Sequence, residues 1–240
     1  MSAPHALGAP VVAPTDVTRP FTEAITAAEK LIAGAEFITD EHDLAEGYDY
    51  LAGSISAILH LVRARNLSHP TFVTSTGPYT KMGLDNPDTL YYHADVEPLG
   101  TYRIWGRRGT TADLSFQVLR GDYSPSEVPG GDDAFDDRRI PIAADGTFEI
   151  TFGPLGSVPE GPGSFALGEG ASMLAVREVF SDWNAQPGEI MIERVDTVGT
   201  APAEPDLERV MKRYRTAAKM LTARIYTWFN FPSGSTSTSR

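Results

Sequence analysis

The sequence predicts an α+β protein in which an antiparallel β-sandwich or jelly-roll-like core follows two N-terminal helices and precedes one long C-terminal helix. Three features of the apolar pattern support this fold class. Apolar residues recur at helical spacing within 18–66, alternate with polar residues from about residue 89, and recur at helical spacing again after residue 204. Strands that are grouped, rather than alternating with helices, favour an α+β arrangement.

Both ends of the chain lack a periodic apolar pattern. Residues 1–17 are rich in Ala, Pro and Val, which predicts a flexible arm, and residues 232–240, with the sequence PSGSTSTSR, predict a disordered tail. The stretch between them, 18–231, is interpreted as a single domain with a helical lead-in (18–66), a β core (85–197) and the C-terminal helix (204–229).

The two N-terminal helices have recognisable starts. Thr18 and Pro20 supply a capping hydroxyl and a first-turn proline for the first helix. The second helix is expected to begin at Thr39 or Asp40, to carry acidic residues in its first turn, and to end near Asn66.

Eight strands are expected in the β core, at 89–96, 101–108, 112–119, 138–143, 147–152, 164–168, 172–180 and 189–195. Turn sequences such as EPLG, RRGT, ADGT and QPGE separate several of them. The stretch GGDDAFDDRR at 130–139 is interpreted as a solvated acidic loop, although it contains the D-D-x-x-D string that binds magnesium in terpene cyclases.

The composition narrows the classes of partner. Lys and Arg number 20 against 32 Asp and Glu, a formal net charge of −12. This balance excludes nucleic acid and anionic membrane surfaces as main partners, because both require clustered cations. The absence of cysteine excludes disulfides, thiolate nucleophiles and Cys-ligated zinc. No signal-peptide pattern is present and no apolar run approaches about 20 residues, so a cytoplasmic protein is expected.

Residues 85–95, with the sequence DNPDTLYYHAD, form the strongest candidate for a functional site. The turn at their start leads into a strand, on which Tyr91, His93 and Asp95 share one face. Such a face can donate, accept and transfer protons. We expect His93 to be the acid/base, Asp88 or Asp95 to orient it, and Tyr91 to donate a hydrogen bond. The alternative is structural: the turn only sets the start of an edge strand with a polar, solvated face.

His93 and Asp95 also form an H-x-D pattern, which supplies two of three metal ligands in jelly-roll oxygenases. The usual third ligand is a second histidine, but none of the five histidines follows His93, and His69 is the only suitable upstream candidate. A catalytic metal is therefore not expected, and no organic cofactor is expected either.

Polar and aromatic residues of the turn and of other strands are expected to contact a ligand: Asn86, Arg103, Trp105, Phe116, Arg177 and Trp183. The aromatic members would form apolar walls. Arg103 and Trp105 share a strand face that can hold an anion or a planar ligand, or can simply cover the outside of a sheet. Arg177 can pair with an aspartate of residues 85–95, and a structural ion pair there is the simpler interpretation.

Two segments resemble the bacterial family called domain of unknown function 1214. They are GLDNPDTLYYHADVEPLGTYRIWGRRGT at 83–110 and VREVFSDWNAQPGEIMIERVD at 176–196, and the resemblance spans about 80–197. It implies a β-sandwich or jelly-roll core and self-association, but no agreed reaction. The family's marker residues fall on Asn86, Pro87, Asp88, Thr89, Tyr91, Arg103, Arg177, Asp182 and Trp183. The chain departs from the family at 161–172, where GPGSFALGEGAS lacks the family's Asn-Trp.

Together these features predict a cofactor-independent enzyme that performs acid/base chemistry on a small, largely apolar molecule. Isomerisation, cyclisation, dehydration and hydrolysis all belong to this class. The alternative is a non-catalytic protein that binds a small molecule or assembles into an oligomer.

Overall fold

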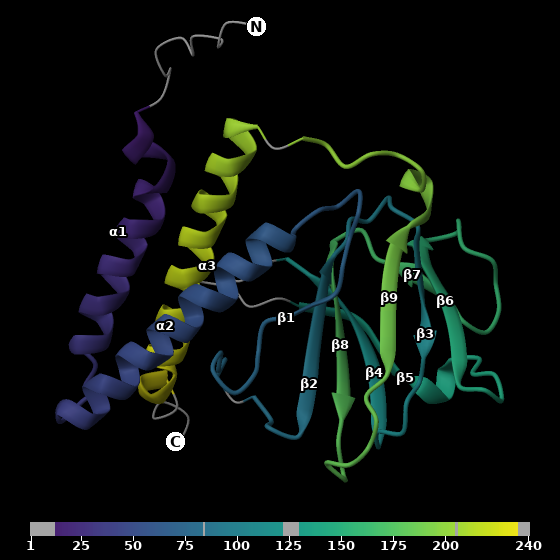
Figure 1. Cartoon of the computed structure of the whole chain (residues 1–240), viewed down its shortest axis with the longest axis horizontal. Coiled ribbons are helices and arrows are strands. Elements are labelled where there is room, and N and C mark those ends of the chain that lie inside the picture. The colour runs from purple at the N-terminus through teal and green to yellow at the C-terminus, as the bar shows by residue number, and fades with distance from the viewer. Residues whose placement is uncertain (1–12, 84, 122–129, 205, 235–240) are drawn as a thin grey trace, which may run out of the picture.

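A computed structural model describes residues 13–83, 85–121, 130–204 and 206–234. These residues form a two-sheet β-sandwich with a layer of three helices at one side of it (Figure 1). The predicted α+β class, with two helices before the sandwich and one after it, is confirmed.

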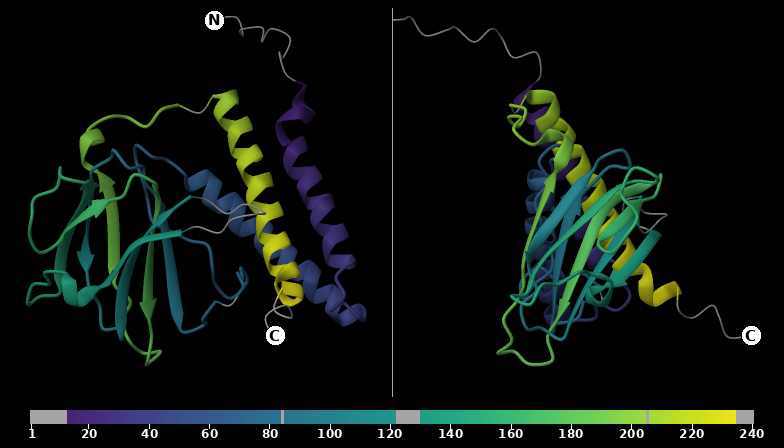
Figure 2. Two further views of the ribbon diagram at one scale, coloured as in Figure 1. Left: turned by 180° about the vertical axis from the view of Figure 1, so that it is seen from behind. Right: turned by 90° about the vertical axis from the view of Figure 1, so that its right-hand side faces the viewer.

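The helices are α1 (Pro14–Ala33), α2 (Glu41–Ala64) and α3 (Leu207–Gly234). Their apolar faces pack on one another and form a hydrophobic cluster separate from the sandwich core. The left view of Figure 2 shows the three helices together at one side of the two sheets. Asp40 is the N-cap of α2, as predicted: its side chain accepts hydrogen bonds from the backbone N–H groups of His42 (2.8 Å) and Asp43 (2.9 Å).

The ends of α1 and α3 differ from the prediction. Helix α1 begins at Pro14, so residues 14–17 of the predicted arm are helical and Pro20 lies inside the helix. Pro14 supplies the first-turn proline that was assigned to Pro20. Helix α3 extends to Gly234, beyond the predicted end at 229. The rest of the predicted arm and tail, 1–12 and 235–240, lies outside the described residues.

The sandwich consists of a five-stranded and a four-stranded sheet. The first has the order β1 (Val73–Thr74), β2 (Thr89–Asp95), β8 (Ala171–Val179), β4 (Asp113–Arg120), β5 (Gly130–Asp136). The second has the order β7 (Ser164–Leu167), β6 (Thr147–Pro154), β3 (Tyr102–Arg107), β9 (Glu189–Arg194). All neighbouring strands are antiparallel except β6 and β7, which are parallel.

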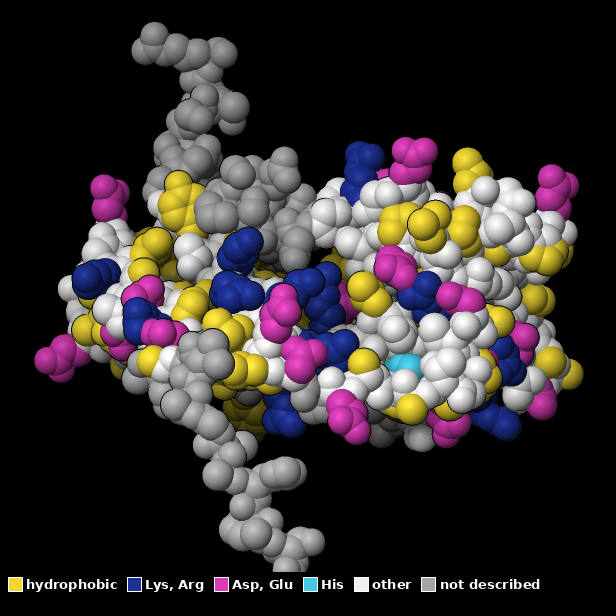
Figure 3. All heavy atoms as spheres, turned by 90° about the horizontal axis from the view of Figure 1, so that it is seen from above, with side chains coloured by type: hydrophobic (Ala, Val, Ile, Leu, Met, Phe, Trp, Pro, Cys, Tyr) yellow, Lys and Arg dark blue, Asp and Glu magenta, His cyan; other side chains and the backbone are white. Residues whose placement is uncertain are grey.

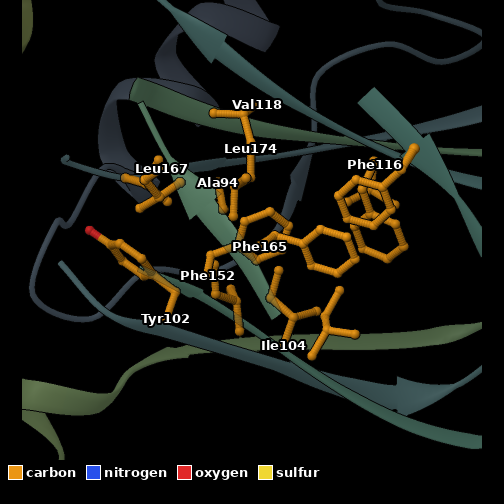
Figure 4. Packing of buried hydrophobic residues seen from close by; sticks show 14 of the residues in the cluster. Ala94, Tyr102, Ile104, Phe116, Val118, Phe152, Phe165, Leu167 and Leu174 are labelled. Carbon is orange, nitrogen blue, oxygen red and sulfur yellow. The ribbon is translucent and has the colours of Figure 1, made fainter. Parts of the chain in front are cut away.

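Aromatic and branched side chains from both sheets fill the space between them (Figure 4). The rings of Phe135, from the five-stranded sheet, and Phe165, from the four-stranded sheet, stack 3.7 Å apart between centroids. Phe165 also stacks on Phe152 at 5.3 Å. The Phe135–Phe165 contact joins the two sheets, and all three rings belong to one hydrophobic core.

The prediction for residues 130–143 was wrong. The acidic stretch is strand β5 rather than a loop, and the strand expected at 138–143 is a 3-10 helix, Asp137–Arg139, followed by one bridge between Ile142 and Phe148. Phe135 anchors β5 in the core, while Asp132, Asp133 and Asp136 place three carboxylates on the same edge strand. Charged side chains on an edge strand hinder further strand pairing, so a strongly acidic composition is compatible with a strand here.

Candidate functional site

Strand β2 has two covered faces. Ala94 is buried in the sandwich core and Tyr92 packs against it, so the alternate residues Tyr91, His93 and Asp95 lie on the opposite face. This confirms that Tyr91, His93 and Asp95 share a face, and it shows that the face points out of the sandwich. The helical layer stands beside this edge of the sandwich, next to β1 and β2 (Figure 1).

A cavity of about 290 Å³ lies where the helices meet β1, β2 and β8. This volume is near the lower end for small-molecule pockets. Its lining comes from α2 (Ile58, Leu61, Val62), from α3 (Met220, Arg224, Trp228), from the sheet (Val73, His93, Asp95, Met173) and from neighbouring segments, including Ser75 and Met82. Most of these side chains are apolar, and a few polar groups converge among them.

His93 is the principal polar group of the cavity. Its Nδ1 lies 3.1 Å from Oγ of the buried Ser75, and its Nε2 makes no hydrogen bond with any described residue. Burial, with a smaller contribution from the nearby Arg177 charge, lowers the pKa of His93 from 6.5 to about 4. The ring is therefore neutral at pH 7 and can accept or donate a proton through its second nitrogen.

Asp95 serves a different partner from the one expected. Its carboxylate pairs with Arg65, at the end of α2, with Nε and Oδ1 3.3 Å apart. The pair joins β2 to the helical layer at the rim of the cavity. Ser75, rather than a carboxylate, therefore orients the His93 ring.

The turn before β2 is built as predicted but stands away from His93. Oδ1 of Asn86 accepts a hydrogen bond from the N–H of Asp88 (2.9 Å), and the Tyr91 hydroxyl accepts one from the N–H of Asn86 (3.0 Å). Asp88 lies five residues before His93, about 17 Å along an extended strand, so it cannot orient the ring. Asn86, Asp88 and Tyr91 do not line the cavity and instead fix the turn.

The other predicted ligand contacts are dispersed. Arg103 and Trp105 lie on the outer face of the four-stranded sheet, where Arg103 pairs with Glu149 (2.7 Å) and Glu193 (3.0 Å) and covers the Trp105 ring at 4.5 Å. Their strand forms the far layer of the sandwich, so its outward face cannot reach the cavity. Of the two interpretations of Arg103 and Trp105, the geometry supports the one in which they cover the outside of a sheet rather than hold a ligand.

Three further residues expected to contact a ligand are also placed elsewhere. Phe116 is buried in the sandwich core because the face of β4 that carries it points toward the other sheet. Arg177 donates a hydrogen bond to Gln117 (3.0 Å) rather than pairing with an aspartate. Trp183 is 71% exposed and stacks on Phe180 outside the cavity.

Sequence reasoning missed several polar residues of the cavity, of which Ser75 and Arg224 matter most for its chemistry. Ser75 lies in the linking segment, where no periodic pattern singles it out. Arg224 had a signal: it lies four residues from both Met220 and Trp228, which places a cation on the apolar face of the last helix.

No metal site is formed by the part of the chain that the structure describes. No group of three His, Asp or Glu side chains converges there. His69 bonds the backbone carbonyl of Thr200 through Nε2 (2.9 Å) and does not line the cavity with His93.

A buried acid outside the cavity, Glu178, has a structural position. Its Oε1 accepts hydrogen bonds from Thr111 Oγ1 (2.8 Å) and from the N–H of Gly188 (2.6 Å). Gly188 packs closely on this carboxylate: a Cβ added at residue 188 would lie 3.3 Å from Oε1 of Glu178. Glu178 thereby ties two loops to β8 at the end of the sandwich remote from the cavity.

Comparison with known proteins supports the fold. A crystal structure of an uncharacterized protein from Burkholderia cenocepacia is similar over 88% of this chain, with 27% identity and a TM-score of 0.81. The chain spans 58% of that protein's length. The VPA0106 protein from Vibrio parahaemolyticus aligns over 81% of this chain and 59% of its own, with 12% identity and a TM-score of 0.34, too low to support an argument.

The comparisons name no activity. No protein-family model matches the sequence, and no curated protein matches it. Among the described residues, no helix is both long enough and apolar enough to span a bilayer.

Proposed function

We propose that the protein binds a small, largely apolar molecule in the cavity between the helices and β2, and that His93 performs acid/base chemistry on it. The position of His93 carries the proposal. A neutral imidazole, held by Ser75 through Nδ1, lines a cavity whose other walls are mostly apolar. Such a group can exchange a proton with a bound molecule through Nε2.

The chemistry that fits this arrangement is proton transfer without a cofactor. The class includes isomerisation, cyclisation, dehydration and hydrolysis. A histidine with a pKa of about 4 is a weak base whose conjugate acid returns its proton readily. Isomerisation, in which one group removes a proton and then delivers it, suits such a residue best.

One observation favours the second candidate, a non-catalytic binding protein. The His93 ring is hydrogen-bonded to the hydroxyl of Ser75 rather than to a carboxylate of the described residues, and Asp95 pairs with Arg65. Catalytic histidines are commonly oriented by such a third group. Under this alternative, His93 and Ser75 provide hydrogen bonds to a ligand that leaves unchanged.

Cyclohexanone in D₂O tests the acid/base proposal, because its α-protons exchange only when a base removes them. We expect ¹H NMR to show faster loss of the α-proton signal with the protein than with buffer. His93→Gln, which keeps a hydrogen-bonding side chain, should abolish the acceleration. His60→Gln changes an exposed histidine of α2 that does not line the cavity, and should leave it intact.

Two results would contradict acid/base catalysis by His93. Exchange at the buffer rate, although ligand-observed NMR shows that cyclohexanone binds, would favour the non-catalytic alternative. Equal acceleration by the wild type and His93→Gln would remove His93 from the mechanism.

Three further expectations from the sequence belong to this proposal. They are membership of the domain of unknown function 1214 family, self-association, and a cytoplasmic location. The resemblance of 83–110 and 176–196 to that family supports the first two, and the acidic composition is compatible with the third.

A further inference from the structure

Arg224 is a cation buried at the cavity wall. It lies on α3 one turn from both Met220 and Trp228, and all three side chains line the cavity. Arg224 is only 5% exposed. Its charge is therefore held away from bulk water, on the face of α3 that meets the cavity.

The guanidinium of Arg224 is only partly satisfied by the protein. One terminal nitrogen donates a hydrogen bond to the Lys81 carbonyl, and the group lies 5.9 Å from the Tyr50 ring centroid. Its Nε is buried and has no hydrogen-bond partner, and no ion pair joins Arg224 to a carboxylate of the described residues.

Other poorly exposed arginines of this protein have acidic partners. Arg108 pairs with Asp137, and Arg194 pairs with both Glu97 and Asp196. A buried charge without a counter-ion is costly, and a carboxylate matches the planar fork of donors on a guanidinium. Arg224 thus lacks the acidic partner that Arg108 and Arg194 have, and it lines a cavity that a ligand can enter.

A basic groove adjoins the cavity. Arg65, Arg209, Lys212 and Arg213 line it together with Asp206 and Glu208, and Val62 and Arg65 belong to both the groove and the cavity. Figure 3 shows Lys and Arg side chains gathered where the helical part meets the sandwich. On a chain with a net charge of −12, a local excess of cations attracts anions to this place.

We propose that the molecule bound in the cavity is a hydrophobic carboxylic acid, whose carboxylate pairs with Arg224 and whose apolar part lies among Ile58, Met173, Met220 and Trp228. The cavity of about 290 Å³ accommodates roughly ten non-hydrogen atoms, at about 30 Å³ for each water-sized group. This inference names the ligand class for the proposed function, and it rests on the cavity being a binding site.

Octanoate and octan-1-ol test the inference, because the two share a chain length and differ in charge. Isothermal titration calorimetry at pH 7 should show octanoate binding at least about tenfold more tightly than octan-1-ol to the wild-type protein. Arg224→Met should remove that preference while leaving the affinity for octan-1-ol within about threefold of the wild type. Arg224→Lys, which keeps the charge but loses the fork, should retain part of it.

Lys219→Met is the matched control. It removes one positive charge from the same helix, at an exposed position that does not line the cavity, and should leave the preference for octanoate unchanged. Because the preference is a ratio measured within one protein, a change in stability of Arg224→Met does not imitate the expected result.

The outcomes separate this inference from the proposed function. Equal affinity for both probes in the wild type, or a preference that survives in Arg224→Met, would overturn the carboxylate assignment and leave the cavity as a site for neutral molecules. Failure of both probes to bind would overturn both proposals.

Discussion

Replacing Phe152 by alanine is expected to lower the free energy of unfolding by about 3–5 kcal/mol. Phe152 is 0% exposed, and its ring stacks on Phe135 (centroids 5.9 Å apart) and Phe165 (5.3 Å) between the two sheets. The substitution removes these contacts and leaves a void that a close-packed sandwich cannot collapse around. Urea unfolding followed by circular dichroism measures the loss.

Leu155 provides the control for that measurement. It directly follows β6, which carries Phe152, but it is 85% exposed. Leu155→Ala should change the free energy of unfolding by no more than about 0.5 kcal/mol. Similar losses for the two variants would show that Phe152 is not at the centre of the sandwich.

The stability of the protein should fall as the pH is lowered from about 6.5 to 4, in part because of His93. Its pKa is about 4 in the folded protein, against 6.5 without the fold, so between these values the unfolded chain binds the proton more readily. The difference corresponds to about 3 kcal/mol of stability, fully present above pH 6.5 and lost as the pH falls toward 4.

His93→Gln isolates this contribution, since the other titrating groups remain in both proteins. The free energy of unfolding of the wild type minus that of His93→Gln should decrease by up to about 3 kcal/mol from pH 7 to pH 4. His60→Gln, at an exposed position, should follow the wild type throughout. A constant difference between the wild type and His93→Gln would mean that His93 is not held neutral by burial.

Local signals were sufficient for most of the fold. The change of apolar period near residue 89 marks the start of β2, and Asp40 caps α2 as its position predicted. The errors arose where tertiary contacts decide the structure. Pairing with β4 and the burial of Phe135 hold the acidic stretch in the sandwich as strand β5, and nothing in the local pattern distinguishes this arrangement from a loop.

The candidate site was only partly predictable for a related reason. Alternation along β2 grouped His93 with Asp95, but it did not show that both faces of the strand are covered, one by a second sheet and the other by helices. Ser75 and Arg224 reach His93's cavity from distant parts of the chain, and only folding brings them together. Conversely, Arg103 and Trp105 lie only about ten residues after His93 in the sequence, but they belong to the four-stranded sheet, on the side of the sandwich away from the cavity.

Methionine-methyl NMR tests most directly the claim that the cavity binds a small apolar molecule. Met82, Met173 and Met220 line the cavity, whereas Met191 is 42% exposed on the outer face of β9. Titration of the ¹³C-methyl-methionine protein with octan-1-ol should shift the first three signals along one saturation curve and leave Met191 unchanged. Shifts confined to Met191, or no saturable shift of Met82, Met173 and Met220, would contradict the account.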